Sequence, residues 1–287
     1  MQLVILAAGM GSRFGGLKQM EPMDEAGNFL LDYSVYDAKR AGFDSVVFII
    51  KKDFYEDFKN SIGKRVEKLI KVDYAFQQLD DLPEGFSVPK GREKPWGTAH
   101  AIYAARNYIH DDFIIINGDD FYGRDTYKVA FDYLTKLPKD SVGKYANVSF
   151  KVSNTMTENG SVKRGVCFED NEHNLTRMVE CVVERNKDKE IVCTPLEGEE
   201  PFKVSEEQPV SMNLFVFNKD LVISSAEATS NLACVDGIKY GAKEADDNYE
   251  DFVIQTRTKG FSNQIKRRLI FGSLALDENN YENNGCS

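Results

Sequence analysis

The sequence predicts an α/β fold: a doubly wound, mostly parallel sheet with a mixed β extension. Two observations predict it. Strand-sized apolar runs alternate with helix-sized runs through the first half of the chain, and a series of strands separated by polar turns follows. The alternation calls for a parallel sheet with helices on both faces. A chain of 287 residues, of which 42% are hydrophobic, is long enough to bury the core of such a domain.

The alternating half contains short, branched apolar runs of the kind that form buried strands. Between them lie segments with helical apolar spacing, and Gly42 follows the first of these as an expected C-cap. The predicted strands are residues 2–7, 45–50, 71–76 and 113–117, and the predicted helices are residues 29–41, 54–62 and 98–109.

From about residue 146 the pattern changes to strands alone, which predicts the mixed β extension. After about residue 221 small and polar residues dominate, a basic stretch follows at 265–269, and the last dozen residues are expected to fray. The predicted strands of the extension are residues 147–153, 165–168, 175–183, 190–194 and 210–217.

The bulk properties exclude several classes of protein. The net charge of −10 argues against a broad nucleic-acid surface. The longest apolar runs are too short to span a bilayer, and the N-terminus lacks the basic region of a signal peptide. The five cysteines are scattered without CxxC spacing, which does not favour a zinc site. The composition is that expected of a reduced cytoplasmic protein.

The strongest motif is the glycine-rich segment LAAGMGSRFGGLK at residues 6–18, directly after the first predicted strand. Glycines let a backbone approach phosphates closely, and successive N–H groups form an anion-binding concavity. Arg13 and Lys18 supply cations for a triphosphate and for the charge that develops as pyrophosphate leaves. The dinucleotide pattern GxGxxG and the P-loop pattern are both absent. A flexible turn with incidental charges is the alternative.

The second motif is Asn-Gly-Asp-Asp at residues 117–120, directly after the predicted strand 113–117. Ligands of open α/β sheets bind beyond the carboxyl ends of the strands, so this motif should face the glycine-rich segment. Asp119 is then placed to hold Mg²⁺ across substrate phosphates. Taken alone, the motif is an ordinary turn. Its combination with the first motif favours a functional site over an ordinary turn.

The third motif, Lys-Pro-Trp-Gly-Thr-Ala-His at residues 94–100, leads into a predicted helix. Thr98 is an expected helix cap, and Gly97 permits close contact with a flat base. Trp96 either packs against the base or fills the core. His100 is expected to be a packing or surface residue rather than a catalyst. Gln77, at the end of a predicted strand, offers an amide suited to a base edge.

Taken together, these motifs resemble the sugar-1-phosphate nucleotidyltransferases and the related MobA-like NTP transferases. The family fingerprint LAAGxGxR followed by a lysine matches residues 6–13 and Lys18, and GTAHA matches residues 97–101. The resemblance covers roughly residues 1–218. It implies the nucleotide-diphospho-sugar transferase fold, which is Rossmann-like.

The resemblance implies a direct displacement, in which the phosphate of a metabolite attacks the α-phosphorus of an NTP, with Mg²⁺ on Asp119. Four residues separate Arg13 from Lys18, fewer than in many glucose-1-phosphate enzymes, which leaves open an acceptor other than a sugar. The implied nucleotide contacts are Ala7, Ala8, Gly9, Gly11, Gln77, Gly97 and Thr98, the implied phosphate contacts are Arg13 and Lys18, and the implied acceptor contacts are Gly165, Glu180 and Asn213.

The C-terminal segment has a different resemblance. Residues 224–241 and 256–272 are similar to the carboxyl-terminal part of the amidase subunit of glutamyl-tRNA(Gln) amidotransferase. The catalytic residues of that family lie upstream of this part and have no counterpart here, so the segment is not expected to hydrolyse an amide. We therefore predict a nucleotidyltransferase domain at 1–220 and an amidase-like tail at 221–287.

Three functions follow from these two parts. They are an active nucleotidyltransferase, a nucleotide-binding protein that has lost turnover, and an assembly fragment related to the amidotransferase. The family implies a second metal ligand beyond residue 220. Asp246, Asp247 and Asp251 have the right chemistry for it, although an exposed acidic helix is the favoured interpretation of these residues.

Overall fold

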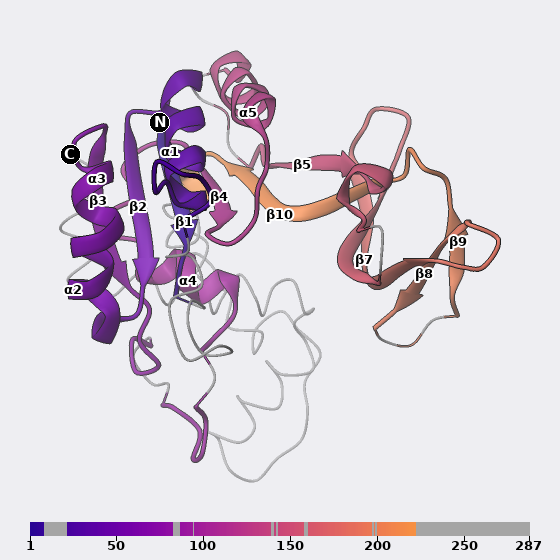
Figure 1. Ribbon diagram of the computed structural model, residues 1–287, viewed down its shortest axis with the longest axis horizontal. Helices are drawn as coiled ribbons and strands as arrows, with labels where there is room; N and C mark the ends of the chain where they lie inside the picture. Colours follow the sequence, from indigo (N-terminus) through magenta and orange to yellow (C-terminus); the bar gives the residue numbers. More distant parts are fainter. Residues whose placement is uncertain are drawn as a thin grey trace, which may run out of the picture.

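The computed structural model of the chain describes residues 1–8, 22–82, 87–93, 95–138, 141, 143–157, 160–196, 198 and 200–221. Within these residues, ten strands form one sheet, in which nine follow the order β3-β2-β1-β4-β10-β6-β7-β8-β9 and β5 pairs with β10 (Figure 1). The glycine-rich segment from Gly9 onwards and the predicted tail beyond residue 221 lie outside the described residues.

The first half of the sheet is parallel, as predicted. Its strands are β3 (Lys71–Phe76), β2 (Ser45–Ile50), β1 (Gln2–Leu6) and β4 (Phe113–Asn117), each paired in parallel with its neighbour. All six side chains of β2 are buried, which is the environment that a continuous branched apolar run requires.

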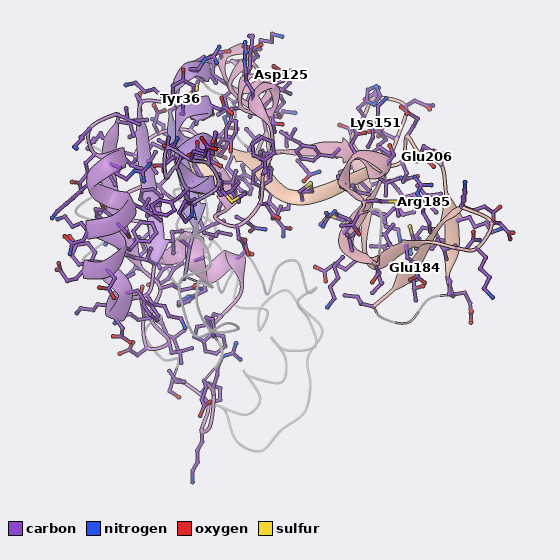
Figure 2. The ribbon with its side chains drawn as sticks, in the orientation of Figure 1. Tyr36, Asp125, Lys151, Glu184, Arg185 and Glu206 are labelled. Carbon is purple, nitrogen blue, oxygen red and sulfur yellow. The ribbon has the colours of Figure 1, made fainter. Side chains whose placement is uncertain are left out.

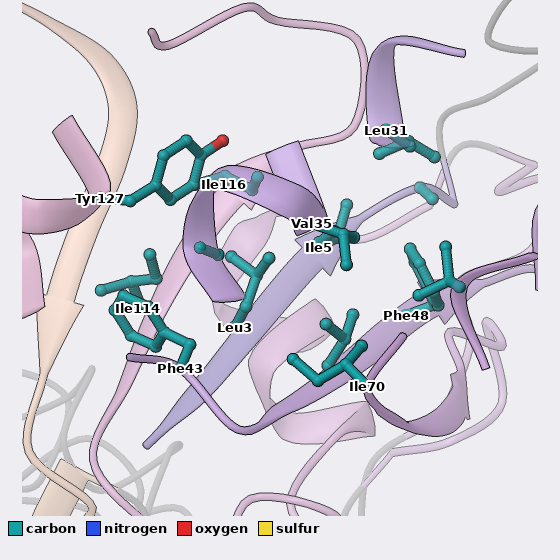
Figure 3. Packing of buried hydrophobic residues seen from close by; sticks show 14 of the residues in the cluster. Leu3, Ile5, Leu31, Val35, Phe43, Phe48, Ile70, Ile114, Ile116 and Tyr127 are labelled. Atoms are coloured by element: carbon teal, nitrogen blue, oxygen red, sulfur yellow. The ribbon is translucent and has the colours of Figure 1, made fainter. Parts of the chain in front are cut away.

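Helices cover both faces of the parallel half, so the doubly wound arrangement is confirmed. Side chains alternate along β1: Leu3 and Ile5 pack with α1 (Leu30–Ala41) and α5 (Arg124–Lys136), and Val4 packs with α4 (Thr98–Ala104) on the other face. Figure 3 shows part of the first cluster, in which Phe48, Tyr127 and Leu31 surround β1. Gly42 closes α1 with φ 120°, and its N–H donates to the carbonyls of Ala38 and Lys39, as expected of a C-cap.

A long strand, β10 (Pro209–Phe217), joins the parallel half to the rest of the sheet. Its residues 215–217 pair antiparallel with β4, and its residues 210–211 pair antiparallel with β6 (Val162–Glu169). On its other side it pairs with β5 (Ala146–Lys151), and that register shifts between Ser211 and Phe215. In Figure 1, β5 and β10 together cross from the helix-covered lobe to a lobe made of strands.

The second lobe is antiparallel and confirms the predicted β extension. It continues from β6 through β7 (Leu175–Arg185), β8 (Ile191–Pro195) and β9 (Phe202–Val204), each paired antiparallel with the one before. Its core is a separate cluster of buried side chains. Salt bridges such as Arg185–Glu206 lie on its outer surface (Figure 2).

Two helical predictions need correction. The single helix predicted at 54–62 is a series of short turns: η2 (Lys52–Phe54), α2 (Tyr55–Phe58), the π-helical η3 (Lys59–Gly63) and α3 (Lys64–Val66). The helix predicted at 98–109 ends at Ala104 and continues as hydrogen-bonded turns. Helix α5 and strand β9 were not predicted.

No helix of the described residues is long and apolar enough to cross a membrane.

Candidate active site

The carboxyl ends of β1 and β4 lie side by side. The N–H of Gly118 donates to the carbonyl of Leu6 at 2.9 Å, and the N–H of Ala7 donates to Ile49 at 2.8 Å. Ala7 and Ala8 are buried at this edge. The first residues of the glycine-rich motif, Leu6 to Ala8, therefore meet the start of the second motif at the edge where ligands of α/β sheets bind. Of the residues predicted here, Gly9, Gly11, Arg13 and Lys18 lie outside the described part of the chain.

Gly118 occupies a position where a side chain would be crowded. A Cβ atom there would lie 3.1 Å from the carbonyl oxygen of Leu6, a backbone atom of β1 that cannot move alone. We expect Gly118→Ala to lower the free energy of unfolding by about 1–3 kcal/mol, the usual cost of overpacking. Urea denaturation measures this effect. Gly97→Ala is the control, because nothing lies within 4 Å of its added carbon; equal stability of the two variants would contradict the argument.

Four of the predicted residues line one cavity of about 450 Å³. Asp119 comes from the end of β4, Gly165 from β6, Glu180 from β7 and Asn213 from β10. These positions are far apart in the sequence, so their meeting follows from the sheet topology. The remaining lining residues are Asn117, Asp120, Lys163, Arg164, Met178, Cys181, Leu196, Ser211 and Met212.

The cavity forms where β10 changes partners. Between the residues that pair with β6 and those that pair with β4, the backbone of Asn213 adopts φ 63°, a left-handed conformation that asparagine tolerates. The Oγ of Ser211 accepts from the N–H of Asn213 at 3.1 Å and donates to Oδ1 of Asn147 at 2.6 Å. The irregular turn of β10 separates the ends of β4 and β6, and the cavity lies between them.

Gly165 adds no side chain to the β6 wall of the cavity. It pairs with Glu180 on one side and with Ser211 on the other. A Cβ atom at this position would lie 2.9 Å from Sδ of Met178, whose side chain covers the glycine. A larger residue would push Met178 from its place on the cavity wall.

A buried tyrosine fixes the end of β4 against β10. The hydroxyl of Tyr122 accepts from the N–H of Asn117 at 2.9 Å and donates to the carbonyl of Met212 at 3.0 Å. Burial raises the pKa of Tyr122 far above its usual value, so the hydroxyl stays protonated and remains a donor. Nδ2 of Asn117 in turn donates to Oδ2 of Asp120 at 2.8 Å. These contacts hold the Asn-Gly-Asp-Asp motif in place.

Charges of both signs line the cavity. Asp119 and Asp120 lie at the end of β4, and Lys163 and Arg164 lie on β6. Carboxylate oxygens are suitable ligands for Mg²⁺, which is usually held by one or two carboxylates together with substrate phosphates. Among the described residues, no group of three or more acidic, histidine or cysteine side chains is placed to hold a metal. Asp119 and Asp120 are carboxylates of the kind that fit Mg²⁺ held partly by other oxygen ligands.

One predicted base-binding residue, Gln77, lies at a second cavity, whose lining does not include Gly97 or Thr98. Gln77 and Trp96 line a space of about 470 Å³ beyond the ends of β2 and β3. Nε2 of Gln77 donates to the carbonyl of Trp96 at 3.0 Å, so its amide holds this segment in place. Trp96 is half-buried, its Nε1 donates to Leu79, and the guanidinium of Arg92 lies 3.6 Å from the ring centroid. The alternative that Trp96 fills the core is therefore wrong.

Two further expectations concern the start of α4. The cap is Gly97, with extended backbone and no side-chain hydrogen bond, so the predicted capping by Thr98 is wrong. Thr98 is the first residue of the helix and is exposed. His100 is buried, its Nε2 lies 2.7 Å from the carbonyl of Asp81, and its Nδ1 lies 3.3 Å from Nε2 of Gln77. It is a packing residue, as expected.

The sequence reasoning missed two residues that line the first cavity, Ser211 and Arg164, and one that supports its lining, Tyr122. Tyr122, Ser211 and Arg164 were not singled out. Arg164 directly precedes the predicted Gly165, and Tyr122 follows the Asp-Asp pair by two residues, so closeness to a motif could have drawn attention to both. Ser211 had no distinguishing feature in the sequence.

The fold and the cavity define a class: an α/β protein whose candidate ligand site lies at the carboxyl ends of parallel strands and against an antiparallel extension. The comparisons with known proteins make this more specific. The model of the nucleotidyl transferase family matches residues 2–253, and the chain belongs to this family. The match extends past the predicted domain boundary at residue 220, and that boundary stays a prediction.

Known structures and sequences resemble the chain to different extents. A putative glucose-1-phosphate thymidylyltransferase from Bacillus anthracis has a TM-score of 0.50 and 13% identity over 93% of this chain and 99% of that one. A UDP-glucose pyrophosphorylase complexed with UDP-glucose has a TM-score of 0.43 and 17% identity over 78% of each chain. The first of these likenesses supports the fold assignment.

The expected resemblance to the amidotransferase is also confirmed. A stretch of 62 residues is 45% identical to the amidase subunit of glutamyl-tRNA(Gln) amidotransferase from Clostridium novyi. The stretch is 21% of this chain and spans only 13% of the length of that relative.

Proposed function

We propose that the chain transfers a nucleoside monophosphate from an NTP to a phosphorylated sugar or similar metabolite and releases pyrophosphate. The observation that carries the proposal is the cavity at the end of β4, where Asp119, Gly165, Glu180 and Asn213 meet. Membership of the nucleotidyl transferase family supports the kind of reaction. The polar groups of Glu180 and Asn213 suit an acceptor that carries hydroxyl groups.

In the proposed reaction, an oxygen of the acceptor phosphate attacks the α-phosphorus of the NTP. The bond between the α-phosphorus and the oxygen bridging to the β-phosphorus breaks, and pyrophosphate leaves with that oxygen. A phosphate monoester is largely ionised at pH 7, so the nucleophile needs no general base. The task of the protein is to hold two anionic reactants together and to stabilise the charge on the leaving group.

The proposed roles divide between the base, the phosphates and the acceptor. Gln77 and Gly97 lie near the base, while Arg13 and Lys18 contact the phosphates of the NTP. Asp119 and Asp120 are the residues that would hold Mg²⁺, which neutralises phosphate charge when bound. The acceptor lies against β6, β7 and β10.

Pyrophosphate release tests the proposal. The protein is assayed with each of the four NTPs and Mg²⁺ against a panel of phosphorylated sugars and alcohols. Turnover with one pair supports the proposal and names both substrates. Binding of an NTP without turnover across the panel would instead favour a nucleotide-binding protein that has lost activity.

A further inference from the structure

Strand β10 is irregular where it lines the first cavity, which the proposed function assigns to the acceptor. Before the irregularity, Ser211 pairs with Ser149 of β5. The next pair is Phe215 with Asn147, so β10 carries more residues than β5 between the two pairs. These extra residues form the turn in which Asn213 has φ 63°. Such a conformation of a residue other than glycine persists only where surrounding contacts fix it, so those contacts control the position of Asn213.

Asn147 is attached to both ends of this turn. Its backbone pairs with Phe215, which follows the turn. Its side-chain oxygen Oδ1 accepts from the hydroxyl of Ser211, which precedes the turn, at 2.6 Å. Its Nδ2 donates to Oγ of Ser149 at 2.8 Å, so both ends of the amide have a partner. One residue of β5 therefore spans the irregular turn of β10, with Oδ1 directed toward Ser211.

The bond to Asn147 also orients the hydroxyl of Ser211. A serine hydroxyl has one proton and two lone pairs. The proton is donated to Asn147, so a lone pair is left for the N–H of Asn213, which donates to Oγ at 3.1 Å. Without Oδ1 of Asn147 the hydroxyl loses this orientation, and the contact that holds the N–H of Asn213 weakens. Asn147 therefore acts on Asn213 through Ser211.

We propose that Asn147 is a positioning residue of the acceptor site, which holds Ser211 and Asn213 in the arrangement that binds the acceptor. This inference rests on the proposed function, because the acceptor is a substrate of that function. Ser211 and Asn213 line the cavity, whereas Asn147 lies behind them on β5 and does not. Strands β5 and β10 run together between the two lobes, so the contact fixes the wall on which the acceptor is proposed to lie (Figure 1).

Steady-state kinetics test this role, with the NTP and the acceptor identified by pyrophosphate release. Asn147→Leu has a similar volume but no polar atom, and it should raise the KM for the acceptor about 10-fold, with smaller changes in kcat and in the KM for the NTP. Asn147→Asp keeps an acceptor oxygen for Ser211 and should restore most of the affinity. Ser149→Ala is the matched control, because it removes the other partner of the same amide and should change the acceptor KM little.

A double-mutant cycle shows whether Asn147 acts through Ser211. In a Ser211→Ala background, Asn147→Leu should cause no further increase in the KM for the acceptor. Thermal unfolding checks that each variant is folded. A full additional effect of Asn147→Leu in that background, or equal increases in the KM for the acceptor and for the NTP, would overturn the proposal.

Hydrogen exchange of the Asn213 amide tests the same contact without turnover. Its N–H should exchange about 10-fold faster in Asn147→Leu than in the wild type, and at the wild-type rate in Ser149→Ala. Amides of β2, in the parallel half of the sheet, report any loss of global stability. Unchanged exchange in Asn147→Leu would overturn the proposal whether or not pyrophosphate is released. Faster exchange in that variant, together with no pyrophosphate release from the wild type, would count against the transferase function alone.

Discussion

Replacing Asp119 by alanine is expected to slow pyrophosphate release by about 100- to 1,000-fold, the range found when one electrostatic contact to a reacting centre is removed. Asp119 is an exposed residue on the cavity wall at the end of β4, so the substitution should affect the reaction more than the fold. The measurement is the rate of pyrophosphate release at saturating NTP and acceptor over a range of Mg²⁺ concentrations.

The dependence on Mg²⁺ separates a role in metal binding from a role in packing. If Asp119 holds the metal, the Mg²⁺ concentration for half-maximal rate rises in Asp119→Asn, because an amide oxygen is a weaker ligand than a carboxylate. Asp188→Ala, at a surface turn of the antiparallel lobe, is the control for a lost carboxylate. A variant Asp119→Ala with more than half of the wild-type rate would exclude the proposed role.

The parallel half of the sheet was the most predictable part of the fold. Strands β2, β3 and β4 have the bounds that the sequence predicted. Each is a short apolar or half-apolar run bounded by polar residues, and β2 and the first four residues of β4 are buried. A strand buried on both faces needs a continuous apolar run, and that pattern can be recognised without knowledge of its neighbours.

Local pattern was less informative where tertiary contacts decide the structure. The segment predicted as one helix at 54–62 contains a π turn that ends at Gly63, and a Cβ atom at Gly63 would lie 2.2 Å from the hydroxyl oxygen of Tyr74. The close packing of Tyr74 on this turn comes from β3, which lies outside the helical segment itself. Helix α5 was missed, although the spacing of its buried residues Tyr127, Ala130 and Leu134 is that of one helical face.

The candidate site shows the same division. The motif at residues 117–120 follows a predictable strand, so topology alone placed it at the ligand-binding edge. Gly165, Glu180 and Asn213 were expected only from the family resemblance. Their meeting depends on the irregular turn of β10, whose positive φ at Asn213 leaves no periodic trace in the sequence. A charge on a strand, such as Arg164, is usually solvated, and only the structure shows its place in the cavity.

Replacing Tyr122 by alanine is expected to lower the free energy of unfolding by about 3–5 kcal/mol, as for other buried aromatic residues. The side chain belongs to the core cluster of the parallel half and is only 4% exposed. Its ring packs beside Phe150 of β5, with 6.2 Å between the centroids. Urea denaturation followed by circular dichroism measures the loss.

The variant Tyr122→Phe separates the hydroxyl from the ring. It keeps the packing but leaves the N–H of Asn117 and the carbonyl of Met212 without their partner, which costs about 1–3 kcal/mol. Tyr36→Phe, at an exposed tyrosine of α1, is the control and should change stability little. The hydroxyl joins the end of β4 to the irregular turn of β10, so Tyr122→Phe should also reduce turnover under conditions where the protein remains folded. Full activity together with reduced stability would show that the bond supports the fold without positioning the site.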